Sequence, residues 1–387
     1  MARLSCPFHR ADRIRVVRAW LIRGVVGLLT VGVLLAAGYG YLLKGVYATY
    51  LQGQTTSNIH DRLYFDQDSV LATAPRPWAE KIDAQRWEPS ASLRTALDSI
   101  HTGALLVVQR DTVRYEAYFE DVTAESRTNS FSMGKSVVVL LTQIAIQRGE
   151  VPGWETPAKR YLPWITGPGA DRLTLRHLSE MTADLNWREN YQKPFGITAR
   201  AYYGHSVEHT MREIEVGNPG AQYEYQSGST QLLSLCLEAA TGRKLTDLAG
   251  EYLWSPLGAE TNATWHTDGT GEALAYCCLN ATARDFARLG QLLLDHGKAN
   301  GVSVVDSAFL ARATVPHALS AFYGQSFWCG KTSNGTPFVY YRGHLGQWIV
   351  SVPSKDAVFV RLGHHHGPAR GDHPRALIRL LDEWVTR

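Results

Sequence analysis

The stretch FSMGKSVVVLLTQIAIQRGE, residues 131–150, places Ser132 three residues before Lys135 at the start of a long apolar run. If a helix begins near Ser132, the two side chains lie on the same face, with their Cβ atoms roughly 5–6 Å apart. The start of a helix also presents backbone N–H groups that have no partner within the helix. The stretch therefore predicts either a capped helix with a solvated lysine or a serine nucleophile beside its base.

The apolar run bears on this choice. A serine is a weak nucleophile until a base removes its proton. A lysine can be that base only if its pKa falls well below ~10.4, and burial among apolar side chains lowers the pKa of a lysine. The sequence VVVLL at 137–141 would supply such surroundings. The spacing and the apolar run thus support one hypothesis, in which Lys135 activates Ser132.

Two later segments carry further polar residues in short motifs. YEYQSGS, residues 223–229, contains Tyr225 and Ser227 about 90 residues after Lys135. GHLGQW, residues 343–348, contains His344 and Gly346 at the expected start of a strand. The chain therefore presents S-x-x-K, Y-x-S and H-x-G in that order.

This order resembles the penicillin-recognising serine hydrolases. The closest likeness is to the class C β-lactamase-like branch, which includes esterases and 6-aminohexanoate-dimer hydrolases. The resemblance covers about residues 95–387, and it extends beyond the motifs. LWSPLGAE (253–260) and LNATARDFARLGQLLLDHG (279–297) are similar to connecting segments of this branch.

The resemblance implies roles for three residues in catalysis. Ser132 would be the acylated nucleophile and Lys135 its partner base. Tyr225 would pass a proton to the leaving group or activate the deacylating water. The oxyanion hole would consist of the backbone N–H groups of Ser132 and Gln347, and each donor of this kind typically changes the rate by roughly 10²–10³.

The resemblance also implies residues that contact the substrate. Ser227 would occupy the polar position of the second motif, and His344 and Gly346 would line a strand beside the substrate, where Gly346 would allow the edge strand to approach closely. Trp187 and Tyr191 stand where this branch often places aromatic groups that face the substrate, although core packing explains them equally well. Where the family usually has Ser-Gly, this chain has Ala183–Asp184, which leaves the local loop geometry open.

Patterns at both ends of the region 96–387 predict the sheet of an α+β fold. TGALLVVQRDTVRYEAYFE, from residue 102, indicates two strands around Arg110–Asp111. Two hairpins follow near the C-terminus, one around Asn334–Gly335 and one around 354–356, and residues 373–387 close the chain as an amphipathic helix. We expect one antiparallel sheet flanked by N- and C-terminal helices, with a mostly helical subdomain inserted within residues 150–320.

The N-terminus differs in composition from this body. Residues 1–23 hold six Arg and one Asp, and residues 24–43 are twenty uncharged residues, which is long enough to span a bilayer. Arginines on that side predict a cytoplasmic N-terminus and a single-pass anchor in the inner membrane. A signal peptide cleaved before Tyr39 is the alternative. Residues 44–95 are expected to be a linker that wraps the body.

Charge, cysteine and histidine patterns exclude several classes of function. The chain after residue 23 has 33 basic and 35 acidic residues, without the clustered basic patch of a nucleic-acid-binding protein. Adjacent Cys277–Cys278 rarely bridge each other, so these cysteines are interpreted mostly as small buried residues. An oxidising compartment leaves open a disulfide to Cys236 or Cys329. His364–His366 follow a predicted strand without the carboxylate pattern of a catalytic zinc site, so we expect no metal and no organic cofactor.

These observations predict a membrane-anchored serine hydrolase with a periplasmic or otherwise extracytoplasmic body. It would cleave an ester or amide of a small molecule through an acyl-enzyme on Ser132. A cell-wall D-alanyl-D-alanine carboxypeptidase or a β-lactamase is the alternative within the same fold. A non-catalytic envelope receptor is the alternative from another class. The sequence leaves the acyl group, the leaving group and the oligomeric state open.

Overall fold

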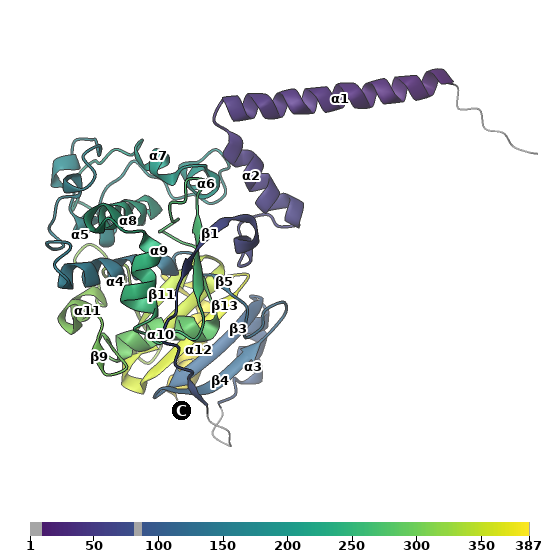
Figure 1. Cartoon of the computed structure of the whole chain (residues 1–387). Coiled ribbons are helices and arrows are strands. Elements are labelled where there is room, and N and C mark those ends of the chain that lie inside the picture. The colour runs from purple at the N-terminus through teal and green to yellow at the C-terminus, as the bar shows by residue number, and fades with distance from the viewer. Residues whose placement is uncertain (1–9, 81–86, 387) are drawn as a thin grey trace, which may run out of the picture.

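The computed structural model describes residues 10–80 and 87–386 (Figure 1). Residues 1–9 of the predicted basic N-terminus, which include Cys6, lie outside this range. The helices are α1 Arg10–Ala36, α2 Gly40–Ala48, α3 Ala91–Asp98, α4 Met133–Gln147, α5 Leu175–Ser179, α6 Ile197–Tyr203, α7 Val207–Met211, α8 Ser227–Thr241, α9 Leu245–Leu248, α10 Ala283–Leu294, α11 Ser307–Ala313 and α12 Arg375–Val385. The strands are β1 Asp66–Val70, β2 Ala79–Glu80, β3 Thr102–Gln109, β4 Thr112–Tyr118, β5 Thr128–Asn129, β6 Ala263–Thr267, β7 Leu279–Ala281, β8 Lys298–Ala299, β9 Val302–Ser303, β10 Trp328–Lys331, β11 Pro337–Gly343, β12 Gln347–Val352, β13 Ala357–Gly363, β14 Ala369–Arg370 and β15 His373–Pro374.

The main sheet joins strands from both ends of the body in the order β10-β11-β12-β13-β3-β4-β2. All three hairpins predicted from the sequence are present in it. Arg110 and Asp111 both have positive φ at the β3–β4 turn, which is the geometry of a tight two-residue hairpin. Strand β13 pairs antiparallel with β3 across some 250 residues of sequence, so the two halves of the sheet are direct neighbours. The segment inserted between them in sequence lies to one side of the sheet, where Figure 1 shows the teal helices α4, α5 and α8.

Helices cover both faces of this sheet. Both faces must be covered because both carry apolar side chains. In β12, successive buried side chains alternate between two hydrophobic clusters, one on each face. Trp348 and Val350 face the cluster formed with α3 and α12, whereas Ile349 faces the cluster formed with α4 and α10. The predicted α+β class, with terminal helices on the sheet and a largely helical insertion, is confirmed.

The segment 44–95 is more than a linker. Strand β1 pairs antiparallel with β6 in a second sheet of order β1-β6-β7-β5. Helix α3 begins at Ala91, before the predicted start of the body at residue 96. The pairing of β1 is a long-range contact, and the short polar sequence DQDSV gives no local signal of it.

The uncharged segment 24–43 is not one helix. Helix α1 ends at Ala36, and Gly38 adopts a positive φ of 78° that interrupts the helical path. Residues 40–43 instead belong to α2, which packs on α6 of the body. The stretch long and apolar enough to cross a membrane is Arg15–Ala36, and its most apolar window has no side chain buried within the protein.

Gly290 on α10 offers a test of the packing between this helix and the sheet. A Cβ atom at Gly290 would lie 2.5 Å from Val358 Cγ1 and 3.0 Å from Ile349 Cγ2. Glycine-to-alanine changes inside helices usually stabilise by roughly 0.5–1 kcal/mol. We expect Gly290→Ala to lower the free energy of unfolding by about 1–3 kcal/mol instead, because the core there has no spare volume.

Gly45→Ala on α2 is the matched control, since its Cβ would meet Tyr203 Cδ2 at 3.4 Å, an ordinary contact. Thermal and urea unfolding of both variants measures the difference. Equal stabilisation by the two alanines would show that α10 does not lie against the sheet in this way.

Candidate functional site

Ser132 and Lys135 meet at the start of α4, as their spacing predicted. Ser132 is the N-cap residue, and its hydroxyl accepts a hydrogen bond of 2.9 Å from Lys135 Nζ. The same Nζ donates a second hydrogen bond of 2.8 Å to the carbonyl oxygen of Tyr276. The Lys135 ammonium group therefore lies between the serine hydroxyl and a backbone carbonyl.

The surroundings of Lys135 favour its neutral form. Lys135 is 1% exposed, and burial lowers its pKa from 10.5 to about 8, although the negative charge of Glu189 acts in the opposite direction. The helix supplies this burial, because every residue from Met133 to Ala145 is buried. A buried lysine with a lowered pKa beside a serine is a functional-site signature with a clear physical cause.

Tyr225 and Ser227 also lie at this site. The ring of Tyr225 lies 5.1 Å from Lys135 Nζ. Burial raises the pKa of Tyr225, and a hydrogen bond with Ser132 lowers it, so the phenol stays protonated at neutral pH. Ser227 is the first residue of α8, and its hydroxyl does not face Lys135 but donates to Glu189 Oε1 at 2.8 Å.

Glu189 is the residue of the site that the sequence analysis missed. Its carboxylate accepts hydrogen bonds from the Ser227 N–H at 2.8 Å, from the Ser227 hydroxyl at 2.8 Å and from the Trp187 indole N–H at 2.7 Å. It also lines the cavity above Ser132. Glu189 belongs to no recognisable sequence motif. It lies in a loop two residues after Trp187, and only the folded chain brings this loop into contact with the start of α8.

The two aromatic residues near Glu189 lie in different environments. Trp187 is 1% exposed and packs against Gly228, where a Cβ atom would lie 2.8 Å from the indole. It therefore supports the site from beneath instead of facing the substrate. Tyr191 is 49% exposed, lines the cavity and stacks on His344 with ring centroids 5.0 Å apart, so its contact with the substrate stays a prediction.

His344 and Gly346 belong to a turn, not to a strand. The one-turn segment His344–Gly346 connects β11 to β12, with positive φ at Leu345 and Gly346. His344 faces the cavity, but a Cβ atom on Gly346 would meet Arg361 Nη1 at 2.6 Å and the His365 carbonyl at 2.9 Å. The glycine is required by the turn and by packing beneath it, because β11 and β12 are interior strands without a free edge.

The predicted oxyanion hole has one available donor. The N–H of Ser132 has no backbone acceptor among the residues that the structure describes. The N–H of Gln347 instead donates to the carbonyl of His344 within the turn. The Gln347 side chain is buried and hydrogen-bonds Gly363 in both directions, so this residue anchors the turn to β13.

A cavity of about 1110 Å³ opens above Ser132. Glu189, Tyr191 and His344 form part of its wall, and His365 and His366 another part. The third part comes from the N-terminal segment, which the sequence analysis placed outside the site. Its lining residues there are Tyr41, Leu42, Gly45, Val46, Thr49 and Tyr50.

The structure explains how Ala183–Asp184 can replace the Ser-Gly that the family usually has at this position. Asp184 has a φ of +50°, a conformation that glycine adopts readily and that aspartate tolerates better than most residues. Its backbone carbonyl accepts from the Gly217 N–H at 2.8 Å, and its carboxylate accepts from the Asn218 N–H at 2.6 Å. Aspartate therefore keeps the left-handed turn and adds a hydrogen bond to the facing loop.

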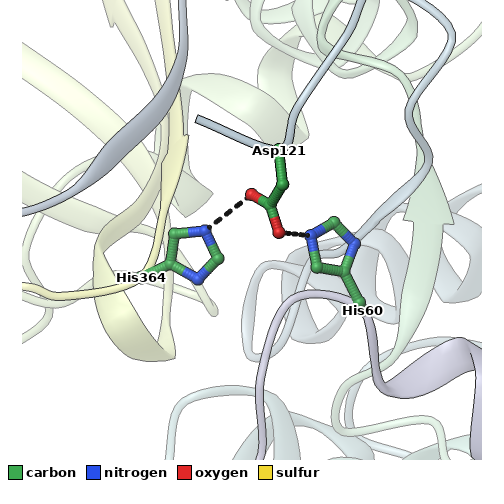
Figure 2. A group of neighbouring side chains, drawn as sticks. All are labelled: His60, Asp121 and His364. Atoms are coloured by element: carbon green, nitrogen blue, oxygen red, sulfur yellow. Dashed lines mark hydrogen bonds and ion pairs between the residues drawn. The ribbon is translucent and has the colours of Figure 1, made fainter. Parts of the chain in front are cut away.

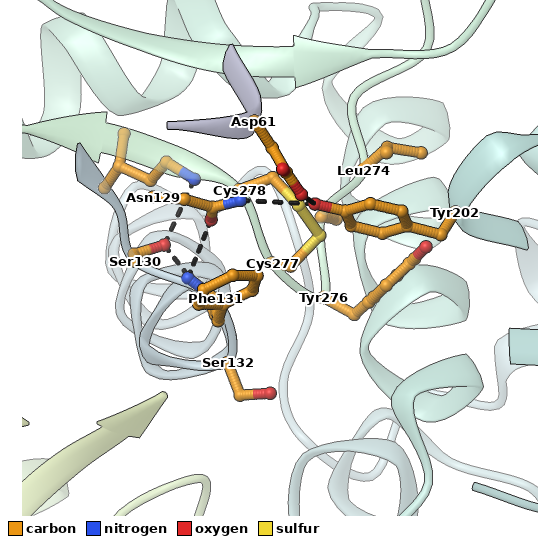
Figure 3. The surroundings of a disulfide bond; sticks show 12 residues. Asp61, Asn129, Ser130, Phe131, Ser132, Tyr202, Leu274, Tyr276, Cys277 and Cys278 are labelled. Atoms are coloured by element: carbon orange, nitrogen blue, oxygen red, sulfur yellow. Dashed lines mark hydrogen bonds between the residues drawn. A yellow bond between two sulfur atoms is a disulfide. The ribbon is translucent and has the colours of Figure 1, made fainter. Parts of the chain in front are cut away.

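Cys277 and Cys278 form a disulfide with each other, which corrects the prediction that adjacent cysteines stay unbridged. Cys236 and Cys329 are free and buried. Figure 3 shows the disulfide beside Phe131 and Ser132. Cys277 lines the cavity, and Cys278 is fully buried with a φ of +76°. Backbone hydrogen bonds from Cys277 N–H to Leu274 O and from His266 N–H to Cys278 O hold the loop on both sides of the bridge.

Comparison with known proteins identifies the family of this chain. The family model described as Beta-lactamase matches residues 90–383. The chain belongs to the Beta-lactamase family. It is 28% identical over 324 residues to the 6-aminohexanoate-dimer hydrolase of Paenarthrobacter ureafaciens, an alignment that covers 74% of this chain and 81% of that protein.

Solved structures confirm the fold of this family. A Bacillus anthracis protein described as a 6-aminohexanoate-dimer hydrolase superposes with a TM-score of 0.70 at 21% identity, covering 85% of this chain and 92% of the other. A class C β-lactamase of Rhodobacter sphaeroides superposes with a TM-score of 0.56 at 18% identity, covering 77% and 99%. The resemblance inferred from three short motifs is therefore confirmed, and the chain is a hydrolase of this family.

The disulfide is expected to hold the Tyr276 carbonyl in place against Lys135. The Cys277 N–H donates to Leu274 O at 3.1 Å, and Cys278 O accepts from the His266 N–H at 3.0 Å. Replacing both cysteines by serine should leave the chain folded but let this loop shift. We expect kcat to fall by between about 10- and 100-fold, the effect of a small misplacement of a catalytic group.

A reducing phosphine should lower kcat of the wild-type enzyme in the same way and leave the double variant unaffected. Cys236→Ala controls for loss of a thiol elsewhere in the core. Peptide mass spectrometry without reduction reports the state of the 277–278 bond. Full activity in the double variant would show that the bridge does not position Lys135.

Proposed function

We propose that this protein is a membrane-anchored serine hydrolase that cleaves an ester or amide through an acyl-enzyme on Ser132. The observation that carries the proposal is the 2.9 Å hydrogen bond between the Ser132 hydroxyl and the buried Lys135 amine. Family membership and the 6-aminohexanoate-dimer hydrolase relative support hydrolysis of a linear amide or a related ester.

The residues present are sufficient for both half-reactions. Ser132 Oγ attacks the carbonyl carbon while its proton moves to the neutral Lys135 amine. The Ser132 N–H at the start of α4 stabilises the developing oxyanion, and Gln347 adds a second donor if its bond to His344 opens. Tyr225 gives its hydroxyl proton to the leaving group and takes back the proton that Lys135 accepted, which leaves the Lys135 amine neutral again. Water then attacks the acyl-enzyme and loses a proton to the Lys135 amine, which passes it to Ser132 Oγ as the acyl bond breaks.

The N-terminal helix supports anchoring of this enzyme to a membrane. Residues Arg15–Ala36 form a helix long and apolar enough to cross a bilayer. Only three residues separate α1 from α2, and α2 lines the cavity. An enzyme retained in this way keeps its cavity close to the bilayer surface, whereas cleavage before Tyr39 would keep α2 and remove only α1.

The wall of the cavity favours an uncharged, partly apolar substrate over a penicillin. Burial lowers the pKa of His344 to about 4, so the imidazole is neutral where a related β-lactamase would be expected to meet a carboxylate with a permanent cation. The carboxylate of Glu189 would repel an anion near Ser227, whereas Lys193 places one cation elsewhere in the wall. Tyr41, Leu42 and Val46 add apolar surface to the wall. These features make the β-lactamase and the D-alanyl-D-alanine carboxypeptidase the weaker alternatives.

Substitution of Ser132 tests the mechanism. We expect Ser132→Ala to abolish labelling by a fluorophosphonate probe and to lower kcat by about 10⁴-fold or more, with Lys135→Ala nearly as severe because members of a catalytic unit lose activity together. Ser229→Ala is the matched control, since Ser229 is also buried near the second motif and its hydroxyl has no partner among the described residues.

Hydrolysis by Ser132→Ala at the wild-type rate would contradict the proposal. A correctly folded wild-type chain that neither reacts with the probe nor hydrolyses any ester, amide or β-lactam offered would instead favour the receptor.

Substrate preference tests the interpretation of the cavity wall. We expect p-nitrophenyl octanoate to exceed both the acetate and nitrocefin in kcat/KM, by at most about four-fold for each added methylene at ~0.8 kcal/mol. Val46→Ser on α2 should reduce the octanoate preference, and His344→Lys should narrow the gap to nitrocefin.

Leu51→Ser is the control for the first variant, because Leu51 is 70% exposed and lies outside the cavity wall. If nitrocefin is hydrolysed faster than every neutral ester, the argument from His344 and Glu189 is wrong.

A further inference from the structure

Three side chains from distant parts of the sequence meet on the surface at one end of the main sheet. His60 precedes the short helical turn at Asp61–Tyr64, Asp121 follows β4 and His364 follows β13. Figure 2 shows the carboxylate of Asp121 between the two imidazole rings. One carboxylate oxygen lies 2.9 Å from His60 Nε2 and the other lies 3.2 Å from His364 Nε2.

The spacing of these atoms fits a metal ion. One ligand atom from each of the three side chains can be chosen so that all lie within 4.8 Å of one another. Nitrogen and oxygen ligands at ~2.0–2.2 Å in a tetrahedral zinc site lie about 3.3 Å apart, close to the two distances to Asp121. The His60 and His364 rings lie 6.0 Å apart between centroids, so both imidazoles would turn toward a shared ion. Two imidazoles and a carboxylate are ligands that zinc accepts.

A fourth ligand is within reach. Glu120 Oε2 lies 3.7 Å from His364 Nε2, so two consecutive carboxylates approach the same ring. Glu120 has a positive φ of 53°, which changes the direction of the chain between them. The side chains of His60 and His364 are 28% and 23% exposed, and that of Asp121 is 56% exposed. The site is thus supported by protein on one side and remains accessible to an ion from solvent.

The charge of the cluster also favours a cation. Glu120 and Asp121 are consecutive carboxylates, and the imidazoles of His60, His101 and His364 have nitrogen atoms 2.9–3.7 Å from their oxygens. His101 Nδ1 lies 2.9 Å from the other oxygen of Glu120 and can orient that carboxylate as a supporting hydrogen-bond partner. A divalent ion bound between the imidazoles and these carboxylates would offset the negative charge that the two consecutive acidic residues bring to one place.

We propose that His60, Asp121 and His364 bind a divalent transition-metal ion of the zinc type, with Glu120 as a fourth ligand. The ion would join the segment between α2 and β1 to the ends of β4 and β13. His365 and His366, which follow His364, line the cavity. The site would therefore stabilise the fold and the cavity wall without taking part in the chemistry at Ser132, and it does not depend on the proposed function.

The pattern was not visible in the sequence, because the ligands come from positions 60, 121 and 364. The run His364–His366 has no carboxylate beside it in the chain, and the next histidine, His373, has its Nδ1 3.1 Å from the hydroxyl of Tyr340 instead. Only the fold brings the carboxylates to the histidine run.

Calorimetric titration tests the site in the full chain, purified in detergent without a histidine tag and stripped with a chelator. With zinc chloride we expect one ion per chain and a rise in melting temperature that grows with zinc concentration. His60→Ala and His364→Ala should each weaken binding by at least about ten-fold. The near-isosteric Asp121→Asn keeps the test valid if an alanine variant fails to fold.

His209→Ala is the matched control, because the His209 side chain is 79% exposed on α7, outside the cluster. Magnesium should not reproduce the stabilisation, since it prefers oxygen ligands in octahedral geometry. Absence of stoichiometric zinc binding would overturn the proposal, as would equal zinc affinity in wild type, His60→Ala and Asp121→Asn. Activity of the enzyme is not needed for either readout.

Discussion

The hydrogen bond from Lys135 to Ser132 is the interaction on which the rest of the site depends. It requires a lysine inside the protein, and an uncharged amine is much less costly to bury than an ammonium. Helix α4 provides this burial through Met133–Ala145, and the Tyr276 carbonyl is the second hydrogen-bond acceptor of the amine among the described residues. The disulfide of Cys277 and Cys278 comes directly after Tyr276, and a Cβ atom at Gly134 would lie 3.0 Å from the Cys277 carbonyl oxygen. Both features are expected to hold the Tyr276 carbonyl in place.

Polar groups around this pair serve positioning more than direct contact. Glu189 accepts hydrogen bonds from the Trp187 indole and from both the N–H and the hydroxyl of Ser227. These bonds fix the loop that carries Trp187 and Glu189 to the start of α8. The N-terminal segment completes the cavity from the other side through α2. Under the proposed membrane anchoring, the helix that follows the apolar segment is itself part of the cavity wall.

Sequence patterns predicted the sheet well, because its hairpins are local and their turns carry clear signals at Arg110–Asp111 and Asn334–Gly335. They also predicted Ser132 and Lys135, which are neighbours on one helix. They failed where the position of a residue depends on distant contacts. Glu189 and strand β1 carry no motif, and the turn at His344–Gly346 depends on Arg361 and His365 packing beneath it.

The rate of fluorophosphonate labelling of Ser132 as a function of pH tests the central claim most directly. Because burial lowers the pKa of Lys135 from 10.5 to about 8, the amine becomes a competent base as the pH rises through about 8. The account predicts a labelling rate that increases across this range and levels off above it, with the modified peptide containing Ser132. A rate that stays constant between about pH 6 and pH 10, or a label on another serine, would contradict it.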